Sequence, residues 1–200
     1  MKTLERALPS LLAAVAIALS LPAVAVDSSA YTCADCPQRI PDAGGESNPA
    51  SVVLSVAANA CAGGAAIGGV DVRVDLLHSH VGDLSITLAS PGGTRYSLLE
   101  RLADASGTPG SCASDDVRAE FGEPDEDAVI ASCVYTLPAV GGVIQPASTL
   151  AALSGPIEPG TWTLEVADHA DAGDGVVRDF ALRFYCSLPR RLFEDGFEEE

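Results

Sequence analysis

The stretch HSHVGDLSITLASPGGT, residues 78–94, decides the fold that we expect for this 200-residue chain. Over residues 84–88, apolar side chains alternate with Ser and Thr, which is the period of a strand with one buried and one wet face. The Ser-Pro-Gly-Gly at 90–93 suits a tight turn, because Pro fixes φ at the second position and Gly permits a positive φ at the third. The stretch therefore predicts a half-buried strand followed by a turn into a returning strand.

The same alternation recurs along the chain. Its clearest case is residues 70–76, where Val and Leu alternate with Asp and Arg, and it returns in GTWTLEVAD, residues 160–168. Trp162, the only tryptophan, lies in that second stretch and is expected in the core. Strands are predicted at 52–56, 70–76, 84–88, 96–100, 129–136, 161–167 and 176–186, with a polar loop at 103–128. Since helical periodicity never extends over three turns, the sequence predicts an all-β, jelly-roll-like sandwich of about eight antiparallel strands.

These two stretches together resemble a known module. A His ahead of Gly-Asp-Leu, a Ser-Pro-x-Gly-Thr turn and the phrase Gly-x-Trp-x-Leu-x-Val-x-Asp are similar to the P domain, also called Homo B, of subtilisin-like proprotein convertases. The resemblance covers about residues 50–186. It implies a β-sandwich in which the matching residues have mainly structural roles: His78, Gly82, Asp83, Leu84, Pro91, Gly93, Thr94, Gly160, Trp162, Asp168 and Gly175.

The resemblance also implies a class of function. In the convertases the similar domain packs against the catalytic domain and supports its folding, its stability and its response to calcium or pH. We therefore expect a non-catalytic module that binds or stabilises a protein partner and is linked to serine endopeptidases and proteolysis. Two alternatives remain open: an accessory subunit of a separate serine endopeptidase, and a small exported adhesin or glycan-binding sandwich.

Catalytic residues are not expected in this chain. Its three histidines, His78, His80 and His169, lie in no phrase that resembles a subtilase catalytic segment, and neither Gly-Thr-Ser nor Gly-x-Ser-x-Gly occurs. His78 and His80 are two residues apart, so on a strand they would share a face, as a metal-binding pair needs. The resemblance instead implies that the His78 ring forms hydrogen bonds inside the sandwich.

Calcium is the one cofactor that the sequence brings into question. Asp168, Asp171 and Asp174 place three carboxylates within seven residues around a Gly, and calcium prefers such oxygen ligands. The acidic loop at 115–127 is a second candidate. The spacing does not fit an EF-hand, and Asp residues at strand ends also accept backbone hydrogen bonds in turns without any ligand.

The six cysteines and the N-terminus indicate export. Residues 1–25 have a basic start, an apolar run and a small-x-small cleavage pattern ending at Ala25, so we expect a signal peptide and a secreted or periplasmic protein. An even number of cysteines in an exported chain favours disulfides. Cys112–Cys133 is the favoured pair because it would close the polar loop. We expect a structural bridge at Cys33 and Cys36 rather than a redox or zinc site, and assign no pairing to Cys61 and Cys186.

The remaining segments and the charge complete the prediction. Residues 26–50 are interpreted as a leader with little regular structure, 51–187 as the sandwich and 188–200 as an acidic tail. The FEDGFE of that tail resembles one found on exported proteins of Gram-negative bacteria, and a disordered tail is the alternative. The net charge of −17 argues against binding nucleic acid, and no later segment is long and apolar enough to span a bilayer.

Overall fold

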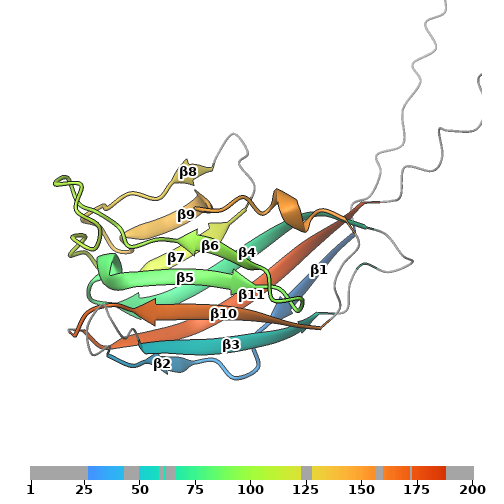
Figure 1. Ribbon diagram of the computed structural model, residues 1–200, viewed down its shortest axis with the longest axis horizontal. Coiled ribbons are helices and arrows are strands. Elements are labelled where there is room, and N and C mark those ends of the chain that lie inside the picture. Colours follow the sequence, from blue (N-terminus) through green and yellow to red (C-terminus); the bar gives the residue numbers. More distant parts are fainter. Residues whose placement is uncertain are drawn as a thin grey trace, which may run out of the picture.

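The chain folds as two β-sheets that pack face to face, shown in Figure 1. The computed structural model describes residues 27–42, 50–58, 61, 66–122, 128–155, 160–171 and 173–187. Strands dominate these residues, and two single turns of 3-10 helix, η2 (Val81–Asp83) and η3 (Ala151–Leu153), interrupt them. The all-β sandwich predicted from the sequence is confirmed.

The smaller sheet is antiparallel throughout and holds both signature stretches. Its strand order is β3 (Ala50–Ala58), β10 (Gly160–Asp168), β5 (Leu84–Ala89) and β6 (Arg95–Leu99). β10 lies between β3 and β5, and its register places Asp168 opposite Leu84. This pairing brings the end of the second signature stretch beside the start of the strand in the first.

The larger sheet is mixed. Its order is β1 (Asp27–Thr32), β11 (Gly175–Ser187), β4 (Ala66–His78), β7 (Val117–Phe121), β9 (Val140–Gln145) and β8 (Val129–Ile130), and β2 (Gln38–Ile40) also pairs with β11. β9 runs parallel to both β7 and β8. The described residues therefore form eleven strands, with two parallel pairings, where about eight antiparallel strands were expected. The jelly-roll order remains a prediction.

The core lies between the two sheets and follows the alternation of the sequence. Val70, Val72, Val74 and Leu76 of β4 point inward, and Asp71, Arg73 and Asp75 of the same strand lie at least partly in solvent. β5, β10 and β11 contribute inward-facing side chains in the same way. Trp162 is only 1% exposed, and its ring packs on that of Phe184 with 5.4 Å between centroids. The core position predicted for Trp162 is confirmed.

Three segments differ from the prediction. β7 lies inside the expected polar loop at 103–128: its inward Val117, Ala119 and Phe121 were obscured by the acidic residues around them. The strand expected at 129–136 covers only residues 129–130. β1 and β2 lie in the segment 26–50 that was expected to have little regular structure, so that prediction was wrong for residues 27–32 and 38–40. Both short strands gain their order by pairing with β11.

Three disulfides tie the described residues together. Cys112 pairs with Cys133, which confirms the favoured bridge, and Cys33 pairs with Cys36 as the structural bridge that was expected. Cys61 pairs with Cys186 at the end of β11. The predicted signal peptide at 1–25 and the acidic tail at 188–200 lie outside the described residues. Within the described part of the chain, no helix has the length and apolar character needed to cross a membrane.

Candidate functional site

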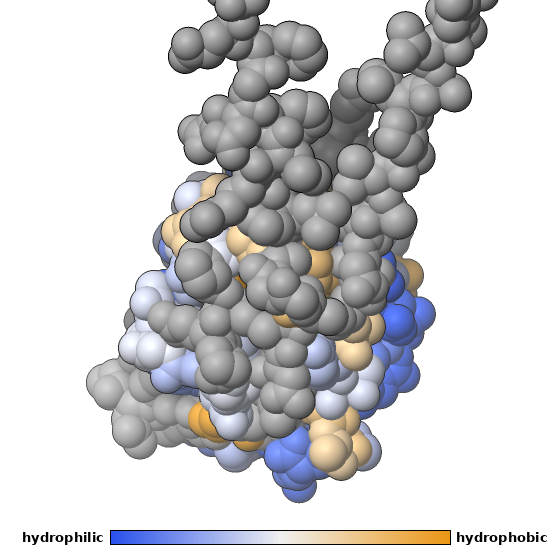
Figure 2. All heavy atoms as spheres, turned by 90° about the vertical axis from the view of Figure 1, so that its right-hand side faces the viewer, coloured by the Kyte–Doolittle hydropathy of each residue, from blue (hydrophilic) through white to orange (hydrophobic). Residues whose placement is uncertain are grey.

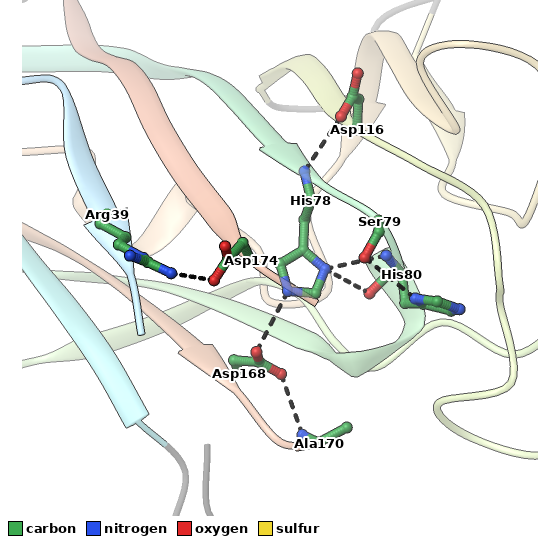
Figure 3. A network of polar contacts seen from close by, with 8 residues as sticks. All are labelled: Arg39, His78, Ser79, His80, Asp116, Asp168, Ala170 and Asp174. Atoms are coloured by element: carbon green, nitrogen blue, oxygen red, sulfur yellow. Dashed lines mark hydrogen bonds and ion pairs between the residues drawn. The ribbon is translucent and has the colours of Figure 1, made fainter. Parts of the chain in front are cut away.

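A buried histidine–aspartate pair lies at the centre of the signature residues. His78 ends β4 and Asp168 ends β10, so each sheet contributes one of the two side chains. His78 Nε2 is 3.3 Å from Asp168 Oδ2, and both side chains are completely buried. Figure 3 shows the ring directed at the carboxylate, whose other oxygen accepts a hydrogen bond from the backbone N–H of Ala170. The pair therefore links the ends of two strands that belong to different sheets.

The other ring nitrogen and the backbone of His78 order the following loop. His78 Nδ1 lies 2.9 Å from the carbonyl oxygen and 3.1 Å from the amide nitrogen of His80. The His78 N–H donates to Asp116 Oδ1 at 3.2 Å, and the Asp116 N–H donates back to the His78 carbonyl at 3.0 Å. Asp116 has a positive φ of 69°, a conformation that Asp tolerates better than most residues. The structural role that the resemblance implied for the His78 ring agrees with these contacts.

Gly175 and Gly82 lie so close to neighbouring atoms that neither position has room for a side chain. A Cβ on Gly175, which lies opposite His78 in the β4–β11 pairing, would come within 2.6 Å of the His78 ring. A Cβ on Gly82 would come within 2.6 Å of the Cys112 backbone nitrogen and 2.8 Å of the Gly110 carbonyl oxygen. Gly82 also donates a backbone hydrogen bond to Cys112. Gly82 thus lets the 3-10 turn that precedes β5 press against the disulfide-bonded loop.

The turn at residues 90–94 closes as the sequence suggested, with one difference. Gly93 N–H donates to the Ser90 carbonyl, and Ser90 N–H donates to the Thr94 carbonyl. The positive φ of 84° belongs to Gly93, the fourth residue, and not to the third as predicted. Gly160, with φ of 143°, faces Pro91 so closely that a Cβ would lie 3.0 Å from the proline ring. The two signature stretches therefore touch at this end of the smaller sheet as well.

The charges of the buried pair affect the pKa of Asp83. Partial burial raises the pKa of the Asp83 carboxyl, and the nearby Asp168 carboxylate raises that pKa further, whereas His80, His78 and Arg101 act in the opposite direction. The Asp83 carbonyl accepts a hydrogen bond from the His169 N–H at 2.9 Å. Asp83 therefore connects the start of β5 to the loop that follows β10.

Two serine–histidine contacts raise the question of whether either serine is a catalytic nucleophile. Ser85 Oγ lies 2.8 Å from His169 Nε2, and Ser79 Oγ lies 3.3 Å from His80 Nδ1. A nucleophilic serine also needs an acid to orient the histidine. No carboxylate in the described part of the chain bonds to the second ring nitrogen of either histidine. Neither contact therefore has the geometry of a catalytic triad.

The three carboxylates considered for calcium do not form a common site. Asp168 is turned inward to His78, and Asp174 forms an ion pair with Arg39, as Figure 3 shows. Among the described residues, no three or more His, Cys, Asp or Glu side chains are placed to hold one metal ion. Calcium binding by Asp168, Asp171 and Asp174 stays a prediction, and in this structure the Asp168 carboxylate bonds to His78 in the core. Residues 123–127 of the other acidic loop lie outside the described residues.

Sequence reasoning missed one group of surface residues. The sequence predicted a short strand over 129–136. The structure exposes five large apolar side chains here: Val129, Ile130, Val134, Tyr135 and Leu137. The string VIASCVYTL contains enough β-branched and aromatic residues to suggest a strand, and nothing in that string shows that most of its large side chains face solvent. We call residues 129–137 the apolar segment.

Comparison with known proteins shows what part of the chain is similar to. Residues 67–122, from β4 through β7, match the family model described as the proprotein convertase P-domain. A calcium-dependent protease of Nostoc sp. is 33% identical over 113 residues, and one of Trichormus variabilis is 32% identical over the same length. Each alignment covers 56% of this chain and 13% of the relative, so the chain corresponds to a small part of those proteases.

Two solved structures align with this chain at low sequence identity. The crystal structure of a serine protease of Aeromonas sobria has a TM-score of 0.41 and 18% identity, and covers 85% of this chain and 28% of its own. The complex of that protease with its chaperone gives a TM-score of 0.40 and 19% identity, with 80% and 28% covered. The family match contains His78, Gly82, Asp83 and Leu84, and over residues 67–122 the chain is similar to proprotein convertase P-domains.

Proposed function

We propose that this chain is a non-catalytic P-domain module that binds or stabilises a protein partner, and that the partner is a serine endopeptidase. The observation that carries the proposal is the family match over residues 67–122. The geometry supports it, because the signature residues of this match bond and pack with one another inside the sandwich. His78 and Gly82, which lie in the match, make such contacts, and so does Asp168, which lies beyond it.

The names of the curated relatives support the choice of partner. Both are calcium-dependent proteases, and this chain spans about an eighth of their length. In such a protein a catalytic domain and a P-domain would share one polypeptide. We propose that here the P-domain meets its protease as a separate molecule or as a neighbouring domain.

The disulfides support the place of action that we propose, which is outside the cytoplasm. All six cysteines of the chain are paired. Stable disulfides form and persist in oxidising compartments such as the periplasm or the extracellular medium. We expect to find the protein in the secreted or periplasmic fraction, with a mature N-terminus near residue 26. Mass spectrometry of both fractions measures this.

The experiment that tests the function uses the purified chain and purified protease. The subtilisin-like proteases of the source organism are produced with the nucleophilic serine replaced by alanine, so that they bind without degrading the chain. We expect at least one to bind and to melt at a higher temperature in the presence of the chain, because a ligand that binds only the folded state stabilises it. The measurement is repeated with and without calcium.

Two outcomes would contradict the proposal. If none of these proteases binds the chain or changes its melting temperature, the module has another partner class. If the pure chain itself cleaves casein, and replacing Ser85 or His169 by alanine abolishes that cleavage, the chain is an enzyme. Cleavage that survives both replacements, and also Ser79→Ala with His80→Ala, would indicate a contaminating protease.

A further inference from the structure

The apolar segment is the most concentrated hydrophobic surface in the described part of the chain. Seven large apolar side chains are exposed among the described residues, and five of these seven lie in the apolar segment, residues 129–137. Ile130, Leu137 and Tyr135 are the most exposed, at 77%, 73% and 72%. Single apolar residues on a surface are common, but a cluster of this kind marks an interaction site more often than chance.

This segment is held in place by the fold. Ala131 and Cys133 pack partly against the core between the outward-facing side chains, and the disulfide to Cys112 fixes the middle of the segment. The Ala139 N–H that follows it donates to the Asp115 carbonyl at 2.7 Å. A surface that is already ordered loses less conformational entropy when a partner binds. The exposed side chains are therefore presented in a prearranged position.

The position of the segment in the sheet leaves it accessible. β8, which begins the segment, is the last strand in the order of the larger sheet and pairs only with β9 within the described residues. Figure 1 shows β8 at the rim of the sandwich. Figure 2 views the molecule from the right-hand side of Figure 1. The described residues visible on that side are a mixture of hydrophobic and hydrophilic ones.

The charge of the sequence indicates which partners are favoured. The sequence has no lysine or arginine between Arg118 and Arg178, whereas it has ten Asp and Glu residues in that interval. Three of the ten are used elsewhere, because Asp168 bonds to His78 in the core, Glu165 pairs with Arg95 and Asp174 pairs with Arg39. Four of the ten, at positions 123–127, directly precede the segment in the sequence. Complementary charges at the rim of an interface raise the association rate and exclude wrong partners. A partner with basic residues around an apolar contact is favoured.

A second copy of this chain is the less suitable occupant. Each copy has a formal net charge of −17, so two copies repel each other at low ionic strength. The charge therefore favours a different protein.

We propose that residues 129–137 form the surface on which the chain docks its protease, through a face of the protease that is apolar at its centre and basic at its rim. This inference rests on the proposed function, since it names the contact surface of that partner. Tyr135 and Leu137, which lie two residues apart and are both largely exposed, provide the central contacts. Exposed aromatic residues of this kind are often the main contributors to binding at protein interfaces.

The test compares two pairs of substitutions in the full chain. Tyr135→Ser with Leu137→Ser removes the central contacts, and Val53→Ser with Leu77→Ser removes the two exposed apolar side chains that lie elsewhere. Binding to the inactivated protease is measured by biolayer interferometry, and melting temperature by calorimetry. We expect the first pair to raise Kd by about tenfold or more, and the control pair to leave Kd unchanged. All variants should melt within a few degrees of the wild type, because the replaced side chains are exposed.

Ionic strength gives a second readout. Raising NaCl from about 50 to 300 mM shortens the Debye length and should slow association several-fold, with a smaller effect on dissociation. If the wild type binds and the Tyr135→Ser, Leu137→Ser variant binds equally well, the docking surface is elsewhere and the proposed function stands. If no protease binds the wild type, the proposed function fails and this inference with it. A wild-type dimer in sedimentation that the same variant dissolves would make a second copy the occupant and overturn the inference.

Discussion

His78 and Ile130, near the start of the apolar segment, lie in strands of the same sheet, yet their side chains are used in opposite ways. At the end of β4 the His78 side chain is completely buried and bonds to Asp168, whereas at the rim of the sheet Ile130 is 77% exposed. The first region contains residues that make the module recognisable, since they determine turns and strand pairing. The second lies outside the family match at 67–122. The difference teaches that the residues that identify this domain and those that we expect to contact a partner occupy separate places.

The largest effect should come from removing the core tryptophan. Trp162→Ala deletes a side chain that is 1% exposed and packs on Phe184, and we expect a loss of about 3–5 kcal/mol in the free energy of unfolding. Tyr135→Ala, which removes an aromatic ring that is 72% exposed, should change that free energy by less than about 0.5 kcal/mol. Urea unfolding followed by circular dichroism measures both. Similar losses for the two variants would remove the contrast between the regions.

The disulfide that joins the two regions should have the next largest effect. Replacing Cys112 and Cys133 together by serine removes a bridge between residues 21 apart in sequence, and chain entropy predicts a loss of about 3 kcal/mol. The double variant should also lose protease binding, because the apolar segment is no longer fixed against the core. Unfolding and binding are measured on the same preparation. A variant that is destabilised but binds normally would show that the bridge does not order the docking surface.

A third prediction concerns the tight contact below the signature loop. Gly82→Ala brings a Cβ within 2.6 Å of the Cys112 backbone, which cannot move as a flexible side chain could, so we expect a loss of about 1–3 kcal/mol. Gly93→Ala is the matched control: no atom lies within 4 Å of its Cβ, and only its positive φ of 84° is unfavourable, at roughly 1 kcal/mol. Thermal unfolding of both variants ranks them. The reverse order would mean that the loop at 110–112 yields to the added methyl group.

The smallest effect is a change in pH dependence. Burial and then the Asp168 carboxylate raise the pKa of Asp83 above its ordinary value of 3.8, so the folded chain binds this proton more tightly than the unfolded chain. The free energy of unfolding therefore includes a contribution that is complete below pH 3.8 and is lost as the pH rises through the folded-state pKa. Asp83→Asn removes this contribution. As the pH rises from about 3 to 6, the wild type should therefore lose stability relative to the variant. Urea titrations across that range measure the difference, and parallel curves would contradict it.

Strand alternation made part of the fold predictable and left the rest hidden. β4, β5 and β10 have one apolar and one polar face, and the sequence predicted each of them correctly. β7 was missed because Glu120 and its acidic neighbours suggested a loop, and β9 because its Gly141 and Gly142 weaken a strand pattern. β1 is ordered by its pairing with β11, about 150 residues later in the sequence, and local propensity carries no signal of that.

The candidate site was predictable in the same uneven way. The resemblance implied an internal role for the His78 ring, but it did not name Asp168, 90 residues further along the chain, as the partner of that ring. Asp168 was predicted both as a structural residue and as a candidate calcium ligand. Only the register of β10 on β5 brings Asp168 to His78. The exposure of Tyr135 was likewise hidden, because a string of β-branched and aromatic residues has the same composition whether it enters the core or stays outside.

The Cys61–Cys186 bridge has a mechanical consequence. Cys186 lies near the end of β11 in the larger sheet, and Cys61 follows β3 of the smaller sheet, so one covalent bond spans the sandwich. A pull on the chain beyond Ser187 would reach this bond before it reached the hydrogen bonds between β11 and β4. Tension would then pass into both sheets at once, and β11 could not be peeled away one residue at a time. We therefore expect that, in the oxidised form, β11 resists being unzipped from that end.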